Sequence, residues 1–118
     1  SAAPVFQNTS GTEIGQLAKS WVNFTGTGTV TINDSFNVSS VTDSGTGKYT
    51  VNMSVAMANI NFSAVTDGRF DVTNDGGGST VISLRRNAFT TSTYGMRGAN
   101  ASGTLTDMAN VTGVVFGD

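Results

Sequence analysis

Apolar and polar residues alternate most regularly between residues 18 and 57. Successive side chains of a β-strand point to opposite faces, so a strand with one buried face shows a period of two. Val22 and Phe24 fall on one face of such a strand, and Trp21 and Asn23 fall on the other. The pattern therefore predicts a strand that begins near the only Trp of the chain.

The segments that follow predict further strands and a hairpin. After a turn-like stretch, segment 29–32 (TVTI) places its two apolar residues on one face. Segments 35–41 (SFNVSSV) and 48–54 (KYTVNMS) also alternate, and the Gly-containing cluster 43–47 lies between them. Two alternating runs joined by a Gly-containing loop are typical of a β-hairpin. An odd step near Ser40 indicates a β-bulge or a change of face.

The N-terminal segment allows two interpretations. Four apolar residues have the spacing of one helical face, namely Ile14, Leu17, Ala18 and Trp21. Thr12 is suited to cap the N-terminus of such a helix. Gly15 interrupts this pattern, and the expected strand begins at once after it. We favour extended structure for residues 1–16, with a short helix as the alternative.

Four more segments after residue 57 have strand-like patterns, namely 59–66, 80–86, 92–98 and 111–116. Segment 80–86 is apolar on both faces until its end, as expected for a central strand or for one facing a neighbouring subunit. Arg85 and Arg86 would then point to opposite faces, and one of them is expected to pair with a carboxylate such as Asp71 or at an interface. About 7–9 short strands with turns between them predict an all-β fold, an antiparallel β-sandwich.

The composition narrows the classes of function. Gly, Ser, Thr and Asn make up 57 of the 118 residues, whereas charged residues are only 12% and the net charge is −2. Six Lys and Arg residues form no basic patch for nucleic acid or an anionic membrane surface. Eight Asn-x-Ser/Thr sites follow from this composition, with a glycosylated eukaryotic surface domain as the formal alternative.

The chain lacks the residue types that most catalytic and metal sites need. It contains no His and no Cys, which excludes Ser-His and Cys-His nucleophiles and ordinary zinc sites. The clustered acids Asp67, Asp71 and Asp75 lie in Gly-rich turn sequence, where Asp commonly bonds its own backbone. They lack the ligand register of an EF-hand, and segment 45–49 fails the phosphate-loop pattern. We expect no enzyme activity, no metal and no cofactor.

Recognition of a glycan needs less, because an exposed aromatic face and a few polar groups on turns are sufficient. The candidate receptor-binding residues are Arg69, Asp71, Asp75, Tyr94 and Arg97. Each has a plainer interpretation: Tyr94 as a core residue, for example, and Arg69 as a solvated surface residue.

Part of the chain resembles a known family. The motifs are KSWVNF at 19–24, GTGTV at 26–30, SFNVSSVTD at 35–43 with GTG at 45–47, and YTVNM at 49–53 followed by Ala56-Met57. They closely resemble a segment of bacteriophage tail-fibre and receptor-binding proteins. Residues 111–117 (VTGVVFG) look like the closing strand of that family. Ser20, Met53 and Ala58 depart from its pattern, which expects Ala, Phe and Pro there.

The resemblance implies a non-enzymatic domain at the distal tip of a trimeric fibre on the virion, exposed to the extracellular medium. On this basis residues 1–17 form an extended segment joining a fibre shaft, and residues 18–118 form the β-sandwich tip. The expected partners are two further copies of the chain, the rest of the fibre, and a bacterial surface polysaccharide or other receptor. A structural module that only trimerises or caps the fibre is the alternative.

Overall fold

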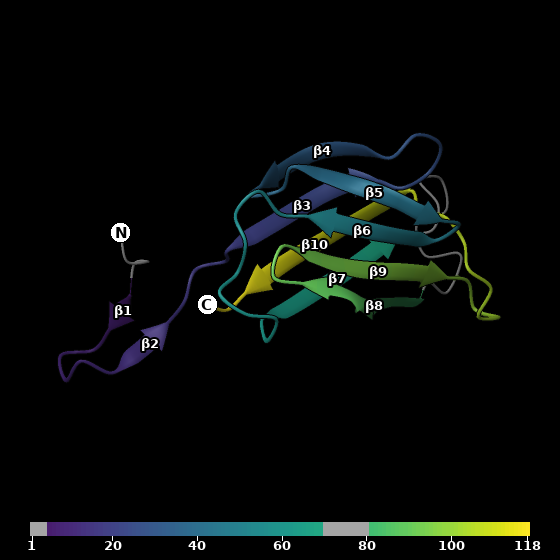
Figure 1. Cartoon of the computed structure of the whole chain (residues 1–118). Coiled ribbons are helices and arrows are strands. Elements are labelled where there is room, and N and C mark those ends of the chain that lie inside the picture. The colour runs from purple at the N-terminus through teal and green to yellow at the C-terminus, as the bar shows by residue number, and fades with distance from the viewer. Residues whose placement is uncertain (1–4, 70–80) are drawn as a thin grey trace.

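The computed structural model describes residues 5–69 and 81–118, and these residues form only strands, turns and irregular segments. Ten strands are arranged in three antiparallel sheets (Figure 1). Their bounds are β1 Phe6–Gln7, β2 Glu13–Gly15, β3 Ser20–Thr25, β4 Thr31–Phe36, β5 Ser40–Gly45, β6 Lys48–Asn52, β7 Ser63–Arg69, β8 Val81–Thr90, β9 Thr93–Ala99 and β10 Asn110–Phe116. The all-β, antiparallel fold expected from the sequence is confirmed.

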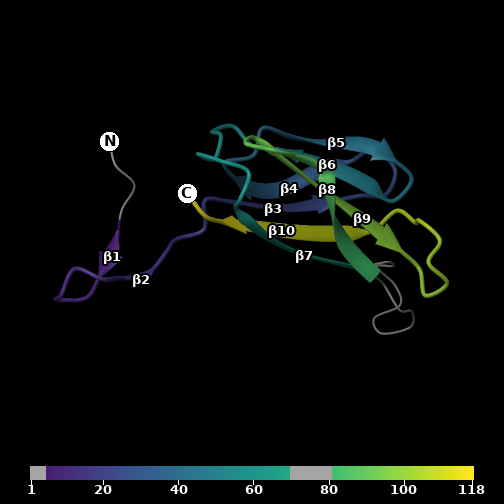
Figure 2. The same ribbon diagram turned by 60° about the horizontal axis from the view of Figure 1, so that its bottom comes forward.

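Two four-stranded sheets form the body of the molecule. One sheet has the strand order β4-β3-β10-β7 and is called the β3 sheet below; the other has the order β5-β6-β9-β8 and is called the β6 sheet. The two sheets lie face to face, and Figure 2 shows them as separate layers. Strand β10 pairs with both β3 and β7, so the last strand of the chain lies inside the β3 sheet.

The core lies between the two sheets. Its main residues are exposed by 1% or less: Val22, Phe24, Val111 and Val115 from the β3 sheet, and Tyr49, Val51, Tyr94 and Met96 from the β6 sheet. The rings of Phe24 and Tyr49 meet edge to face across the core, with 5.2 Å between centroids. Burying each of the larger apolar side chains contributes roughly 1.5–3 kcal/mol. Packing between the sheets is therefore the main source of stability.

Several strand predictions are confirmed, with observed bounds within one residue of those predicted. In β3, Val22 and Phe24 are buried, Trp21 is exposed and Asn23 is half-buried. The strand predicted at 92–98 is β9, and the closing strand is β10. Alternation is sufficient at these places because each strand has one face on the core and one on the surface.

The predicted hairpin is correct only in part. Strand β5 does pair with β6, but Phe36 belongs to β4 in the other sheet. The odd step near Ser40 marks the place where the chain crosses from the β3 sheet to the β6 sheet. A change of sheet restarts the alternation, and the pattern alone does not distinguish this from a bulge.

Two other strand predictions are wrong in detail. In the segment predicted at 59–66, the strand begins only at Ser63, and Ile60 is exposed. Strand β8 lies at an edge of the β6 sheet and is not a central strand, although its apolar residues suggested one. The extra apolar residue at this edge is Val81, which is 54% exposed and does not reach the core.

The adjacent arginines of β8 have different surroundings. The guanidinium of Arg86 lies 4.3 Å from the centroid of the Phe89 ring, a favourable cation–π contact. One terminal nitrogen of Arg85 is buried, without a hydrogen-bond partner among the described residues. The expected partner Asp71 lies outside the described residues.

Strands β1 and β2 form a small hairpin outside the sandwich, which we call the arm (residues 5–17). Every residue of the arm is exposed, and Figure 1 shows it projecting from the end where the C-terminus lies. Glu13–Gly15 is a strand, so the helix alternative for this segment is wrong. The arm separates from the body before Lys19, whose backbone N–H donates to the Val115 carbonyl.

Asn37 holds the crossover between the two sheets. It is the only non-glycine residue with a positive φ among the described residues, at 55°. Its side-chain nitrogen donates to the backbone carbonyls of Lys19 at 3.0 Å and Val55 at 3.1 Å. Its side-chain oxygen accepts from the Val55 N–H at 2.7 Å. Asn adopts this left-handed conformation more readily than other non-glycine residues.

The Tyr49 hydroxyl joins loops at the opposite end of the sandwich. It donates to the Gly26 carbonyl and accepts from the Met108 N–H, both at 2.9 Å. A Cβ at residue 26 would lie only 2.5 Å from this hydroxyl, so the position requires glycine. The contact links the β3–β4 turn to the segment before β10.

We expect Asn37→Ala to lower the free energy of unfolding by about 3 kcal/mol, because three hydrogen bonds are lost and Ala is strained at positive φ. Asn37→Gly loses the same hydrogen bonds without the steric strain and should be less damaging by about 1 kcal/mol. Urea unfolding followed by circular dichroism measures both values. Equal losses in the two variants would contradict the role assigned to the backbone conformation.

We expect stability to fall steeply in alkaline solution. Burial, which is the largest cause, and the nearby Asp107 carboxylate together raise the pKa of Tyr49 to about 12 against the opposing effect of the Met108 N–H. Burial also raises the pKa of Tyr94 above its ordinary value. Unfolded tyrosine ionises near pH 10, so the unfolded state releases protons first and the stabilisation is lost from about pH 10 upward.

Tyrosinate absorbance and circular dichroism, recorded together during an alkaline titration, test this expectation. The two tyrosines should ionise together with unfolding, and Tyr49→Phe should remove part of the absorbance change. Ionisation of both tyrosines near pH 10 with the fold intact would contradict the assignment.

Candidate functional site

The five candidate residues do not form one cluster in the structure. Arg69 is the last residue of β7 and is exposed on the β3 sheet. Arg97 is exposed on the outer face of the β6 sheet, where its Nε donates to the Ser83 hydroxyl at 3.1 Å. The two arginines therefore lie on opposite sheets. Asp71 and Asp75 lie outside the described residues.

Tyr94 is a core residue, and the expectation that it contacts a receptor is wrong. Its side chain is 0% exposed, and its ring lies edge-on to Phe89 with 6.3 Å between centroids. The hydroxyl lies against the backbone of β10, where a Cβ at Gly113 would be 2.6 Å away. In β9 the residues on the same face as Tyr94 and Met96 point into the sandwich, which leaves Arg97 on the surface.

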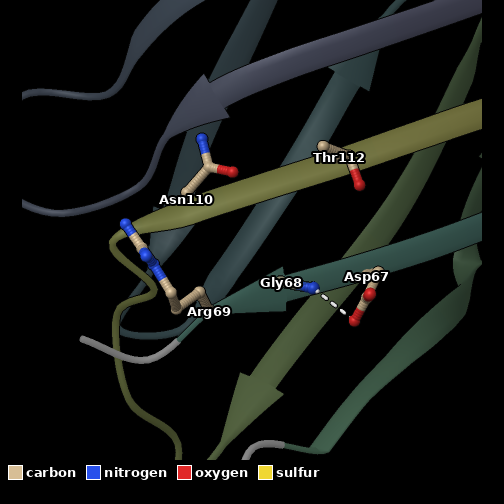
Figure 3. A pocket seen from close by; sticks show the side chains of 5 residues that line it. All are labelled: Asp67, Gly68, Arg69, Asn110 and Thr112. Carbon is tan, nitrogen blue, oxygen red and sulfur yellow. Dashed lines mark hydrogen bonds between the residues drawn. The ribbon is translucent and has the colours of Figure 1, made fainter. Parts of the chain in front are cut away.

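Arg69 lines an open hollow of about 420 Å³ on the β3 sheet (Figure 3). The other lining residues are Asp67, Gly68, Asn110 and Thr112. They come from two neighbouring antiparallel strands, because Arg69 of β7 pairs with Asn110 of β10 and Asp67 pairs with Thr112. Strand pairing thus gathers a cation, an anion, an amide and a hydroxyl on one surface.

Hydrogen bonds fix the amide of Asn110 beside this hollow. Its nitrogen donates to the side-chain oxygen of Asn23 on β3 at 2.8 Å, and the same oxygen accepts from the Asn33 amide at 3.0 Å. Three amides thus bridge β4, β3 and β10 in a row. Among the described residues, no N–H or O–H group donates to the side-chain oxygen of Asn110, so this oxygen can accept a hydrogen bond from a ligand.

Figure 3 shows how the charged residues are held. The Asp67 carboxylate accepts from the Gly68 N–H at 2.8 Å and keeps further acceptor capacity. The Arg69 side chain extends from the end of β7 to the beginning of β10, beside Asn110 and away from Asp67 and Thr112. Its backbone carbonyl accepts from the Ala109 N–H at 2.8 Å, which holds the end of β7 against β10.

The hollow offers polar contacts but no enclosure. Ligand pockets that bury small molecules are concave and mostly apolar, whereas this surface is open and largely polar. Guanidinium, carboxylate, hydroxyl and amide groups can together bind a molecule with many hydroxyl groups that lies along the surface.

The part of the chain described by the structure offers little for metal binding or acid–base chemistry. Within residues 5–69 and 81–118, acidic side chains form no group of three or more that could hold a metal ion. Among the described residues that line the hollow, Asp67 is the only carboxylate, whereas glycoside hydrolysis ordinarily uses a pair. No helix in these same residues could cross a membrane.

Sequence reasoning named Arg69 as a candidate, but it did not select the three other side chains that line the hollow, which are Asp67, Asn110 and Thr112. Thr112 could have been found from alternation, because it lies between the buried Val111 and the buried Gly113. What alternation does not provide is the pairing of β10 with β7, which brings these residues together from positions more than 40 apart in the sequence.

Comparisons of the chain with protein-family models, with curated proteins and with solved structures found no match.

Proposed function

We propose that the chain is a non-catalytic attachment module at the tip of a bacteriophage tail fibre. In this proposal it forms a homotrimer on the virion, faces the extracellular medium and binds a polysaccharide on the bacterial surface. The sequence motifs in residues 19–57, which resemble those of tail-fibre and receptor-binding proteins, support this proposal.

The observation that carries the proposal is the hollow around Arg69. It lies at the end of β7 and the beginning of β10, whereas the arm leaves the sandwich beside the end of β10. A fibre joined through the arm would therefore present the hollow at its far end. Three weak sites on one tip would act together, since linked sites bind more strongly than their single-site affinities indicate.

The second candidate is a structural module that assembles or caps the fibre while another part contacts the receptor. Exposed apolar side chains on the outer face of the β3 sheet favour it, because Trp21 and Phe36 are 37% and 55% exposed there. Assembly and attachment can coexist on one chain. Binding of the chain to bacterial surface polysaccharides distinguishes the two candidate functions.

An array of purified bacterial surface polysaccharides, probed with the full chain, tests the attachment function. We expect Arg69→Ala to weaken binding to any polysaccharide that the chain recognises by about tenfold or more, since a hydrogen bond to a charged group contributes about 1.5–3 kcal/mol. Thr112→Val keeps the shape of the side chain and should weaken binding less.

Arg97→Ala is the matched control, because Arg97 is an exposed arginine on the opposite sheet. We expect it to leave binding within about twofold of the unsubstituted chain. Loss of binding in Arg97→Ala alone would move the site to the β6 sheet. Absence of binding across the array would leave the structural module as the better proposal.

A further inference from the structure

A row of apolar side chains crosses the outer face of the β3 sheet. The strand register places Phe36 beside Trp21, Trp21 beside Val114, and Val114 beside Val65. These side chains lie on four adjacent strands, and Phe116 on the same face of β10 adjoins them. We call these five residues the outer row. Phe36 is 55% exposed, Trp21 37%, Val65 60% and Phe116 38%, so most of the row is open to solvent.

The outer face of the β6 sheet provides an internal comparison. Its cross-strand pairs between β5 and β6 are polar, for example Ser40 beside Asn52 and Thr42 beside Thr50. These side chains bond one another, because the Asn52 amide donates to the hydroxyls of Ser40 and Thr42 at 3.0 Å each. The β5–β6 part of this outer face is therefore polar and bonded internally. The outer row departs from it.

A shallow hollow lies within the outer row. It measures about 260 Å³ and lies between β3, β10 and β7, with Trp21, Val65 and Val114 among its lining residues. Contiguous exposed apolar surface on a soluble protein commonly marks an interaction site. The row thus has both the chemistry and the shape to receive apolar side chains.

The arm also carries apolar side chains that are exposed among the described residues. Val5, Phe6, Ile14 and Leu17 are 53%, 45%, 67% and 57% exposed. An isolated two-stranded hairpin is at best marginally stable in water, so the arm needs another surface to hold it. The arm extends away from the sandwich, and the bond from Lys19 N–H to the Val115 carbonyl continues the pairing of β3 with β10 up to its exit. This direction carries the arm away from the outer row of its own chain.

We propose that the arm of one copy of this chain packs on the outer row of a second copy. Each chain carries one arm and one row, so the two surfaces are present in equal number. A contact between two different surfaces repeats from copy to copy and closes into a ring when the rotation permits. In a closed ring every arm and every row is covered, which an unrelated partner would not achieve.

The inference rests on the self-association in the proposed function and names its contact surface, but it needs neither the receptor nor the threefold count. A chain that binds no polysaccharide would assemble in the same way. The hollow around Arg69 adjoins the hollow in the outer row, because Asp67 and Thr112 line both, whereas Arg69 and Asn110 lie farther from the end where the arm leaves.

Light scattering and sedimentation velocity of the full chain across dilution give the first test. We expect the unsubstituted chain to have a mass that is a multiple of 12.1 kDa. Ile14→Asp on the arm and Val65→Asp on the outer row should each return the mass to that of one chain at concentrations where the unsubstituted chain is assembled. Circular dichroism should show that both variants keep the fold, since both residues are exposed.

Val55→Asp is the matched control, with the same substitution at a residue that is 68% exposed and lies on neither surface. It should leave the mass unchanged. A single-chain mass for the unsubstituted protein at all concentrations would overturn the proposal. Retention of the assembled mass in Ile14→Asp would overturn it as well.

Cross-linking tests the pairing of the two surfaces directly, because the natural chain has no cysteine. Ile14→Cys and Val65→Cys chains are prepared separately, mixed and treated with a short bismaleimide, and the joined peptides are identified by mass spectrometry. We expect links between residues 14 and 65 to exceed links between two copies of either residue at least fivefold, with Val55→Cys as the control. Equal yields of all combinations would contradict the contact.

The same variants separate this inference from the proposed function. If Val65→Asp lost polysaccharide binding while its mass stayed assembled, the outer row would be a ligand surface with Trp21 as a stacking platform, and the proposed contact would be wrong. If no polysaccharide bound but the mass and the cross-links were as expected, only the attachment function would fail.

Discussion

The contact between the two sheets, centred on Phe24 and Tyr49, is the interaction on which the rest of the structure depends. It fixes which face of β3 and which face of β6 point inward, and strand geometry then fixes what their outer faces carry. Because Val22 and Phe24 enter the core, Trp21 and Asn23 must face outward. The apolar end and the polar end of the outer face are both consequences of this one orientation.

The sequence was sufficient for the parts of the fold that depend on local pattern. Alternation predicts β3, β9 and β10 because each has one buried and one exposed face. It fails at Phe36, where the chain changes sheets, and at β8, where apolar residues occupy an edge strand. In both places the deciding fact is which strands are neighbours in space, and that depends on contacts distant in the sequence.

The candidate site could be predicted only for residues whose local sequence indicates exposure at the surface. Arg69 was found because a charged residue beside a Gly-containing turn is expected at the surface. Tyr94 was misplaced because its role depends on the inward face of β9, and an aromatic ring serves a core as well as a binding surface. Nothing in the local sequence marks Asn110, because its orientation depends on the hydrogen bond to Asn23, which lies on a strand more than 80 residues earlier.

The outer face of the β3 sheet therefore has to be considered as one surface with two ends. Strand β10 crosses both ends, with Asn110 in the polar hollow and Val114 and Phe116 in the outer row. Burial of apolar surface stabilises an interface but does not orient the two partners, because it is non-directional. Hydrogen-bonding groups held in fixed positions bury little apolar surface, but they discriminate between ligands. In our proposals the apolar end serves assembly and the polar end serves recognition, and the two regions meet where Asp67 and Thr112 line both hollows.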